Sequence, residues 1–310
     1  MNDKNYKAHF AMLAANVLWG LNSPVAKNVL DSGISALSLT TFRMFGAAIA
    51  FWVTSVFTKK EHVKPEDLLK LFFAALLAIV FNQGSFIMGL SLTSPVDASI
   101  VTTMLPIVTM IVAAIFLKEP ITSKKIGGIF LGAMGAFLLI LTSQHQAGEP
   151  NSGNMWGNLL CLTAQISFAL YLTIFRDLIT RYSTITIMKW MFIYASICFI
   201  PFSFRDITSL QWDTIPTNIY VEIAYVALGA TYLSYMCIMI GQKNLRPTIV
   251  SMYNYAQPIV ASTVAVAVGM DHFGWSKGAA ILLVFAGVYL VTQSKSRAQL
   301  EAMKIKNKRE

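Results

Sequence analysis

Charged residues are scarce in this sequence. Asp, Glu, Lys and Arg supply only 13% of the 310 residues, whereas 55% are hydrophobic. A soluble domain carries about a quarter of its residues as charged side chains, so the scarcity excludes an ordinary soluble domain. The charges that are present cluster between long apolar runs. The composition therefore predicts an integral membrane protein with several spans.

Cysteines and catalytic motifs are scarce as well. The three cysteines, Cys161, Cys198 and Cys237, lie in apolar runs, and their odd number indicates packing residues rather than a disulfide framework. The histidines lie near the N-terminus or in predicted loops, and the sequence has no HExxH, GxSxG or phosphate-binding glycine loop. We therefore expect neither an enzyme nor an ATP-driven pump, and no metal or other cofactor.

Apolar segments, by contrast, are abundant. A helix needs about 20 mostly apolar residues to cross a bilayer. Ten segments meet this requirement, at residues 8–30, 36–57, 68–91, 95–117, 124–142, 155–178, 184–203, 218–241, 247–269 and 274–293. They predict an all-α membrane protein with ten transmembrane helices. The polar stretch at 143–154, rich in Gly, Pro, Asn and Ser, separates two sets of five spans.

The net charge of +9 is distributed unevenly between the loops. Most Lys and Arg residues lie on one side and in the tail at 294–310, whereas the other side is mainly acidic. Positively charged loops stay in the cytoplasm, so both termini are predicted to be cytoplasmic. We expect a multi-pass protein of a bacterial cytoplasmic membrane, with no nucleic-acid partner. The tail either binds membrane lipid through its basic residues or is solvated.

The two sets of spans are related in sequence. A shift of 152 residues aligns SPVDASIVTTMLPIV with RPTIVSMYNYAQPIV, so that Pro95 meets Pro247 and Pro106 meets Pro258. Because each set contains an odd number of spans, the second copy crosses the membrane in the opposite direction. Inverted repeats are typical of secondary transporters, whose substrate site lies at the repeat interface near the midplane.

Several motifs resemble those of one transporter family. They are LWGLNSP in the first span, FRM in the second, SPVDASIVTTMLP in the fourth and LKEPIT before the fifth. With the repeat, they make residues 8–293 resemble the drug/metabolite transporter superfamily, and within it an EamA protein with two repeats. The resemblance implies a ten-helix carrier with a central cavity lined by spans 1, 3, 4, 6, 8 and 9. Members move amino acids, other small metabolites, sugar phosphates or nucleotide sugars.

This resemblance sets the expected domain organisation. The second copy departs from the first where Asp271-His272 replaces Glu119-Pro120, so the resemblance does not assign a substrate. The predicted parts are a first EamA repeat at 8–142, a linker at 143–154, a second EamA repeat at 155–293 and a basic cytoplasmic tail at 294–310.

Helical spacing selects polar side chains that share a face. Span 4 carries Thr102 and Thr103 on one face, and span 9 carries Asn254 and Tyr255 at the equivalent positions. Lipid is a poor partner for hydroxyls and amides, so these faces should line a cavity or form hydrogen bonds between helices. The other substrate-binding candidates are Asn16, Trp19, Asn82, Gln83, Gln165, Tyr171, Tyr235, Tyr253 and Gln257.

Four prolines inside the spans are expected to start or bend helices. Pro95 and Pro247 suit a first helical turn, where the missing N–H matters little. Pro106 and Pro258 would break a hydrogen bond in mid-span.

Two charged residues inside the spans are also candidates. Arg43 could bind a carboxylate or phosphate, extend to the outer interface or pair with an acid. Asp97 could partner the N-terminus of its helix or couple transport to protons or cations. Gly128 and Gly132 of span 5 allow close packing on Gly287 of span 10, with formation of a homodimer as the alternative.

These observations together predict a secondary transporter that exports small metabolites, such as amino acids, by alternating access. A carrier of phosphorylated sugars or nucleotide sugars and a lipid-carrier flippase are the alternatives within transport. A membrane receptor or scaffold is the alternative outside transport, but it gives no reason for an inverted repeat.

Overall fold

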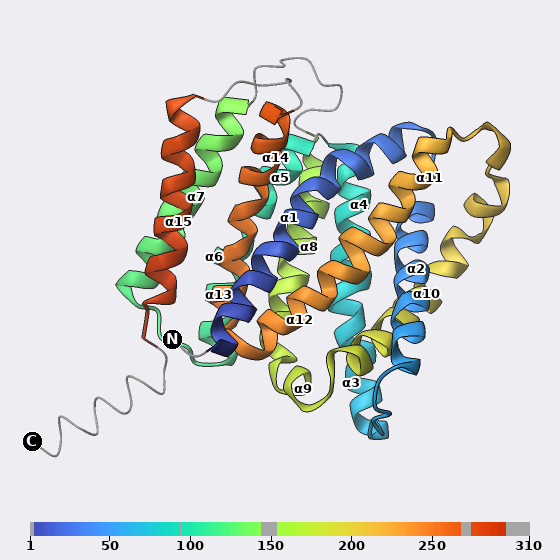
Figure 1. Cartoon of the computed structure of the whole chain (residues 1–310), viewed down its shortest axis with the longest axis horizontal. Coiled ribbons are helices and arrows are strands. Elements are labelled where there is room, and N and C mark those ends of the chain that lie inside the picture. Colours follow the sequence, from blue (N-terminus) through green and yellow to red (C-terminus); the bar gives the residue numbers. More distant parts are fainter. Residues whose placement is uncertain (1–2, 94, 144–153, 268–273, 296–310) are drawn as a thin grey trace, which may run out of the picture.

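The chain folds into a bundle of helices that run between two opposite ends (Figure 1). The structure is a computed structural model that describes residues 3–93, 95–143, 154–267 and 274–295. These residues form helices and connecting turns without a strand. Five helical segments are by themselves long and apolar enough to cross a membrane. The predicted all-α membrane fold is confirmed.

Ten spans follow one another along the described chain. Six are single helices: α1 (Asp3–Asp31), α2 (Ala36–Val56), α7 (Ser123–Ser143), α8 (Met155–Ile174), α10 (Thr184–Ser209) and α15 (Trp275–Thr292). Four are interrupted: α3–η1–α4 (Pro65–Ala75, Leu76–Phe81, Asn82–Leu92), α5–α6 (Pro95–Thr102, Leu105–Phe116), α11–η3–α12 (Thr217–Ala224, Tyr225–Leu233, Ser234–Asn244) and α13–η4–α14 (Pro247–Met252, Tyr253–Tyr255, Ala256–Ala267). Short helices α9 (Arg176–Arg181) and η2 (Trp212–Thr214) lie in loops.

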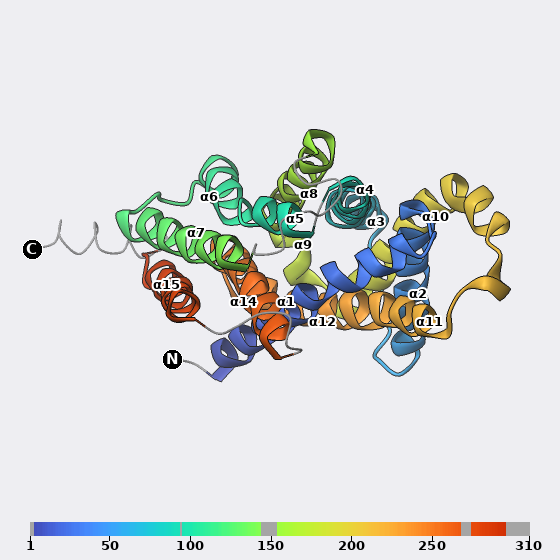
Figure 2. The same cartoon turned by 90° about the horizontal axis from the view of Figure 1, so that it is seen from above.

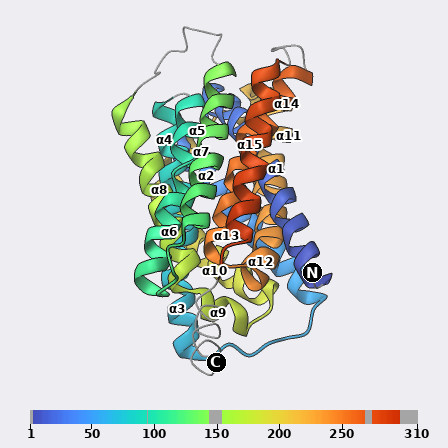
Figure 3. The ribbon, with the colours of Figure 1, turned by 90° about the vertical axis from the view of Figure 1, so that its left-hand side faces the viewer.

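Different helix termini lie at the two ends of the bundle (Figure 3). We call the end where α1 begins and α15 ends the terminal end, and the end where α7 ends and α8 begins the linker end. Span 7 is longer than predicted, because α10 continues past residue 203 to Ser209. There, at the linker end, the hydroxyl of Ser35 donates to Asp206 at 2.7 Å, so the polar residues that indicated a loop extend the helix instead.

Close helix contacts recur in both copies of the repeat. A Cβ atom placed on Gly89 of α4 would lie 2.7 Å from the Sγ of Cys161 in α8. Gly241 of α12, the equivalent of Gly89, contacts Met12 of α1 in the same way. A shift of 149 residues relates Met12 to Cys161. The same close approach is therefore built twice, as an inverted repeat requires.

The contact between α7 and α15 is reciprocal. A Cβ atom on Gly128 would lie 2.6 Å from the carbonyl oxygen of Gly287, and one on Gly135 would lie 2.6 Å from the carbonyl oxygen of Ala280. A shift of 152 residues relates Gly128 to Ala280 and Gly135 to Gly287. Such exchanged contacts are expected when a pseudo-two-fold axis relates two helices. The predicted packing of span 5 on span 10 is confirmed.

Spans 3 and 8 share an irregular turn. The π-helical segment η1 and residues 228–233 of the π-helical segment η3 coincide under the 152-residue shift. Directly after these turns, Gln83 and its equivalent Tyr235 meet, and the Gln83 side-chain amide donates to the Tyr235 hydroxyl at 3.1 Å. Two equivalent residues meet only close to a symmetry axis, so the axis passes through the centre of the bundle.

Spans 4 and 9 are broken at equivalent places. The chain leaves the α-helix after Thr102 in span 4, and at Tyr253–Tyr255 in span 9, where a 3₁₀ turn joins α13 to α14. Pro106 and Pro258 each lie four residues beyond a cavity residue and have no N–H for the usual helical hydrogen bond. The prolines thus account for two matched breaks at mid-span.

Candidate substrate-binding site

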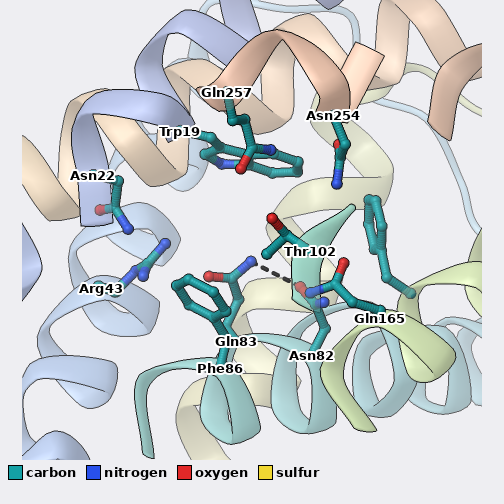
Figure 4. A pocket seen from close by; sticks show the side chains of 11 residues that line it. Trp19, Asn22, Arg43, Asn82, Gln83, Phe86, Thr102, Gln165, Asn254 and Gln257 are labelled. Carbon is teal, nitrogen blue, oxygen red and sulfur yellow. Dashed lines mark hydrogen bonds between the residues drawn. The ribbon is translucent and has the colours of Figure 1, made fainter. Parts of the chain in front are cut away.

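A polar cavity lies between the two repeats in the middle of the bundle (Figure 4). About 450 Å³ of empty space lies in it, counted to its open side. Its walls come from α1, α2, α4, α5, α8, η4 and α14. The lining residues are Trp19, Asn22, Arg43, Asn82, Gln83, Phe86, Thr102, Gln165, Phe168, Asn254 and Gln257.

Arg43 is the charged side chain of this lining. It is only 1% exposed, and its Nε donates to the Thr231 hydroxyl at 3.0 Å. That hydroxyl donates in turn to the carbonyl of Val226, five residues earlier in the π-helical segment. The Nη1 atom of Arg43 is buried and has no hydrogen-bond partner, and no ion pair with a described acid involves this residue. Arg43 therefore presents an uncompensated positive charge inside the bundle.

Asn22 lies beside Arg43 at one side of the cavity (Figure 4). Its Oδ1 atom is buried and has no hydrogen-bond partner. An unpaired buried donor and an unpaired buried acceptor thus occur in one wall, and each is costly unless a ligand or water satisfies it. Asn22 was not among the residues predicted from the sequence, although it follows Trp19 by three residues on the same helical face.

Amide side chains form most of the remaining polar lining, and neighbouring groups fix their orientation. Asn82 donates to the carbonyl of Ala164 at 2.9 Å, and its Oδ1 accepts from Gln83 at 2.8 Å. On the opposite wall, Gln257 donates to the Oδ1 of Asn16 at 3.0 Å. These bonds hold the amides in place before any ligand enters.

Aromatic rings supply the apolar part of the cavity. The indole N–H of Trp19 donates to the carbonyl of Ala230 at 3.0 Å, which fixes the ring. The Trp19 ring meets Phe168 edge-on, with ring centres 5.9 Å apart. Phe86 lies on the same side of the cavity as Gln83 (Figure 4). Phe86 and Phe168 share helical faces with the predicted polar residues Asn82 and Gln165.

Several candidates from the sequence lie behind the lining rather than in it. Tyr171 donates to Gln242 at 3.1 Å, Tyr235 to the carbonyl of Ala78 at 2.9 Å, and Tyr255 to the carbonyl of Ile129 at 3.3 Å. All three tyrosines are at most 1% exposed. None of the three belongs to the cavity lining, so they support the lining from behind by packing.

The remaining residues predicted from the sequence lie at other positions. The Asn16 side-chain amide donates to the carbonyl of Met12 at 2.8 Å, and Thr103 donates to the carbonyl of Ile100 at 2.6 Å. Tyr253 faces a different concavity, on the outside of the bundle. Pro95 and Pro247 each stand first in their helices, α5 and α13. The side chain of Asp97 lies outside the described residues, as do Asp271 and His272 of the second copy.

A polar cluster joins the two repeats at the terminal end. Asp67 of α3 accepts hydrogen bonds from the Tyr182 hydroxyl at 2.8 Å and from Lys70 at 3.2 Å. The backbone N–H of Ser183 donates to Glu61 at 2.8 Å, and Lys243 of α12 donates to the carbonyl of Tyr182. We call these residues the terminal-end cluster. It ties the loop between spans 2 and 3 to spans 7 and 8.

The cluster shifts the pKa values of two groups that lie outside the spans. The hydrogen bond to Asp67 raises the pKa of the Tyr182 hydroxyl above its usual value. Burial raises the pKa of Glu61, but hydrogen bonds from Thr186 and Ser183 lower it by more, so this pKa is below the usual value. Both shifts favour the protonation states that make the observed hydrogen bonds near neutral pH.

A buried ion pair strengthens the same end. Lys125 at the start of α7 lies 2.8 Å from Glu119, and the two side chains are 1% and 8% exposed. The hydroxyl of Thr248, from the second copy, donates to the same carboxylate oxygen at 3.3 Å. The pair therefore also bridges the two repeats. Elsewhere among the described residues, no group of three His, Cys, Asp or Glu side chains could hold a metal ion.

An inverted pair of five-helix repeats with a polar cavity at their interface defines the class of this protein as a membrane transporter of small molecules. The chain belongs to the EamA-like transporter family, whose model matches residues 6–141 and 155–293. The predicted resemblance to the drug/metabolite transporter superfamily is confirmed.

The curated relatives and a solved structure agree with this family. An uncharacterized transporter of Archaeoglobus fulgidus is 24% identical over 89% of this chain and 95% of its own length. The uncharacterized transporter YyaM of Bacillus subtilis is 24% identical over 86% of this chain and 87% of its length. A WAT1-related protein of Arabidopsis thaliana is 23% identical over 94% and 86%. One solved structure shares the fold, with a TM-score of 0.72 and 15% identity over 94% of this chain and 96% of that one.

Proposed function

We propose that the chain exports small metabolites with one carboxylate, such as amino acids, across the cytoplasmic membrane by alternating access. The observation that carries this proposal is Arg43, whose buried Nη1 has no partner in the cavity. A buried charge without a counter-ion is strongly unfavourable. A substrate carboxylate would supply the counter-ion through a charge-assisted hydrogen bond.

An α-amino acid also matches the groups around Arg43. Its ammonium group needs acceptors, and the unpaired Oδ1 of Asn22 lies in the same wall. An apolar or aromatic side chain could pack on Trp19, Phe86 and Phe168. A single arginine favours one carboxylate over a nucleotide sugar, whose two phosphates would call for more cationic groups.

Alternating access is supported by the repeat and by the closed terminal end. We infer that the terminal-end cluster and buried Tyr171, which lies beyond Phe168 along α8 toward that end, close one side of the cavity in this conformation. Two copies of opposite orientation can exchange conformations, which yields a second state closed at the linker end. With the basic terminal end in the cytoplasm, as the loop charges predict, the cavity described here would be closed to the cytoplasm.

Transport by proteoliposomes tests the proposal. The full chain would be reconstituted and loaded with unlabelled amino acids, and the uptake of labelled amino acids by exchange would be measured. We expect saturable exchange, and we expect Arg43→Gln to lower it by about 10- to 100-fold, since a hydrogen bond to a charged group contributes roughly 1.5–3 kcal/mol. Arg43→Gln should lower the exchange of amino acid amides much less, because these amides lack the carboxylate.

Arg205→Gln is the matched control, because Arg205 is an exposed arginine at the end of α10. It should leave exchange unchanged. The proposal would be wrong if no amino acid moved saturably, or if Arg43→Gln reduced the exchange of acids and amides equally while the melting temperature stayed the same. Equal loss would indicate a structural arginine.

A further inference from the structure

A second concavity lies on the outside of the bundle, and it shares no lining residue with the central cavity. The first turns of α1 and the length of α15 lie on either side of span 9 (Figures 2 and 3). About 790 Å³ of empty space lies between them, counted to the open side. We call this concavity the side groove. Its apolar walls include Phe10, Leu13, Met252, Ile259, Val284 and Val288.

Polar groups of the side groove lie where α1 begins. His9 of α1 and the hydroxyl of Tyr253 in η4 form a hydrogen bond across it. Tyr6, one turn before His9, also contributes to the lining. The groove is therefore apolar along most of its length and polar toward the terminal end, where α1 begins.

Two exposed lysines lie at the terminal end, on or next to the helices that form the groove. Lys7 stands between the lining residues Tyr6 and His9 on α1, and Lys295 follows the end of α15. No described acid belongs to the groove lining. The charge pattern is thus positive at the surface and neutral along the walls.

We propose that the side groove binds an anionic glycerophospholipid, with an acyl chain along the apolar walls and the phosphate beside Lys7, His9 and Lys295. The groove opens toward the surrounding bilayer, which supplies such a molecule at high concentration. An empty groove would leave its walls without packing partners, and an acyl chain restores these contacts. Basic residues at the membrane surface attract anionic headgroups.

The bound lipid would support one wall of the central cavity. Tyr253 faces the side groove, whereas the next residue, Asn254, lines the cavity. The helix that carries His9 also carries Trp19. A lipid that packs on α1 and η4 therefore stabilises the arrangement of both cavity walls. This inference does not depend on which solute is transported.

Thermal unfolding of the full chain in a neutral detergent tests lipid binding. Dioleoyl phosphatidylglycerol at about 100 times its Kd should raise the melting temperature by roughly 5 °C. Dioleoyl phosphatidylcholine should raise it less, and sn-glycerol 3-phosphate should not raise it. Equal stabilisation by the two lipids would overturn the proposal. Stabilisation by glycerol phosphate alone would overturn it in favour of a soluble phosphate ligand.

Two kinds of variant distinguish the contribution of the acyl chain to lipid binding from that of the headgroup. Ala256→Phe fills the side groove and should abolish stabilisation by both lipids, whereas Ala279→Phe, on an exposed face of α15, should retain it. Changing Lys7 and Lys295 to Gln leaves the walls intact and should weaken binding of phosphatidylglycerol by roughly 30-fold without affecting phosphatidylcholine. Unchanged affinity for phosphatidylglycerol in this double variant would contradict the proposal even if Ala256→Phe failed to fold.

Discussion

The two copies of the repeat share one packing frame but place different chemistry in the cavity. Gly89 and Gly241 make equivalent close contacts, and spans 3 and 8 carry π-helical turns at matched positions. In the cavity, by contrast, Thr102 of the first copy faces Asn254 of the second. The same packing occurs in both copies because each copy must adopt the conformation of the other during alternating access.

The difference in chemistry makes the cavity lining asymmetric. Gln83 lines the cavity, but its equivalent Tyr235 lies behind the lining and holds it. Arg43 has no charged equivalent, since shifts of 149 and 152 residues lead to Phe192 and Ala195. A symmetric frame with an asymmetric lining can move between two states while it holds a solute in one orientation.

The largest effect is expected from the helix contact that the frame requires. Gly128→Ala would place a Cβ atom 2.6 Å from the carbonyl oxygen of Gly287 and 2.7 Å from Val291. Overpacking of this kind destabilises by about 1–3 kcal/mol. Gly127, the neighbouring residue, has no atom within 4 Å of such a Cβ. Gly127→Ala should instead stabilise by up to about 1 kcal/mol, because alanine favours the helix.

Melting temperatures of the two variants measured in one detergent would show opposite signs. The matched pair removes differences in composition, because both changes are Gly to Ala on one helix. A Gly128→Ala protein as stable as the wild type would show that α7 and α15 do not approach as closely as described.

The sequence was sufficient to predict the frame but not the lining. Span lengths, matched prolines and the inverted repeat follow from local patterns, so the ten spans could be predicted. The side chains in the lining depend on turns that local spacing does not reveal. Asn254 and Tyr253 lie in a 3₁₀ turn, where a residue rotates by more than in an α-helix, and they face opposite sites.

The π-helical turns had the same consequence for spans 3 and 8. They change the register of the helical face that follows, so α-helical spacing alone did not show which residues of spans 3 and 8 line the cavity. The three alternatives for Arg43 also stayed open in the sequence, because they differ only in which helices surround it. The contact with Thr231 of η3 joins residues 188 positions apart.

A smaller effect is expected when the second copy is made to match the first. Asn254→Thr gives both copies the same residue and removes one amide from the cavity. Loss of about one hydrogen bond, roughly 1 kcal/mol, should raise the apparent KM for amino acid exchange by about fivefold. Asn244→Thr, an exposed position at the end of α12, is the matched control and should leave KM unchanged. Equal KM values for the two variants would remove Asn254 from the proposed site.

The two ends of the bundle can be compared in a similar way. Tyr182→Phe removes a hydrogen bond to Asp67 from the terminal-end cluster, whereas Tyr220→Phe removes one to the carbonyl of Trp212 at the linker end. We expect Tyr182→Phe to favour the state open at the terminal end by roughly 1 kcal/mol or less, since the cluster is partly exposed.

Maleimide labelling of a cysteine at position 239 would measure this shift. Met239 is buried beside Tyr171, so it becomes reactive only when the terminal end opens. With the three native cysteines replaced, Tyr182→Phe should increase the labelling rate up to fivefold, and Tyr220→Phe should not. An unchanged rate in Tyr182→Phe would show that the cluster does not hold this end closed.

The smallest effect concerns the acid dependence of the same cluster. Hydrogen bonds lower the pKa of Glu61 in the folded protein, so its ionised form contributes stability above the unfolded pKa of about 4.3. This contribution is lost as the pH falls through the lower folded pKa. The wild type should therefore exceed Glu61→Gln in melting temperature by a constant small amount between pH 6 and 8, and the difference should shrink in more acidic solution. A difference that persisted unchanged at pH 3 would mean that Glu61 stabilises the cluster by packing rather than through its charge.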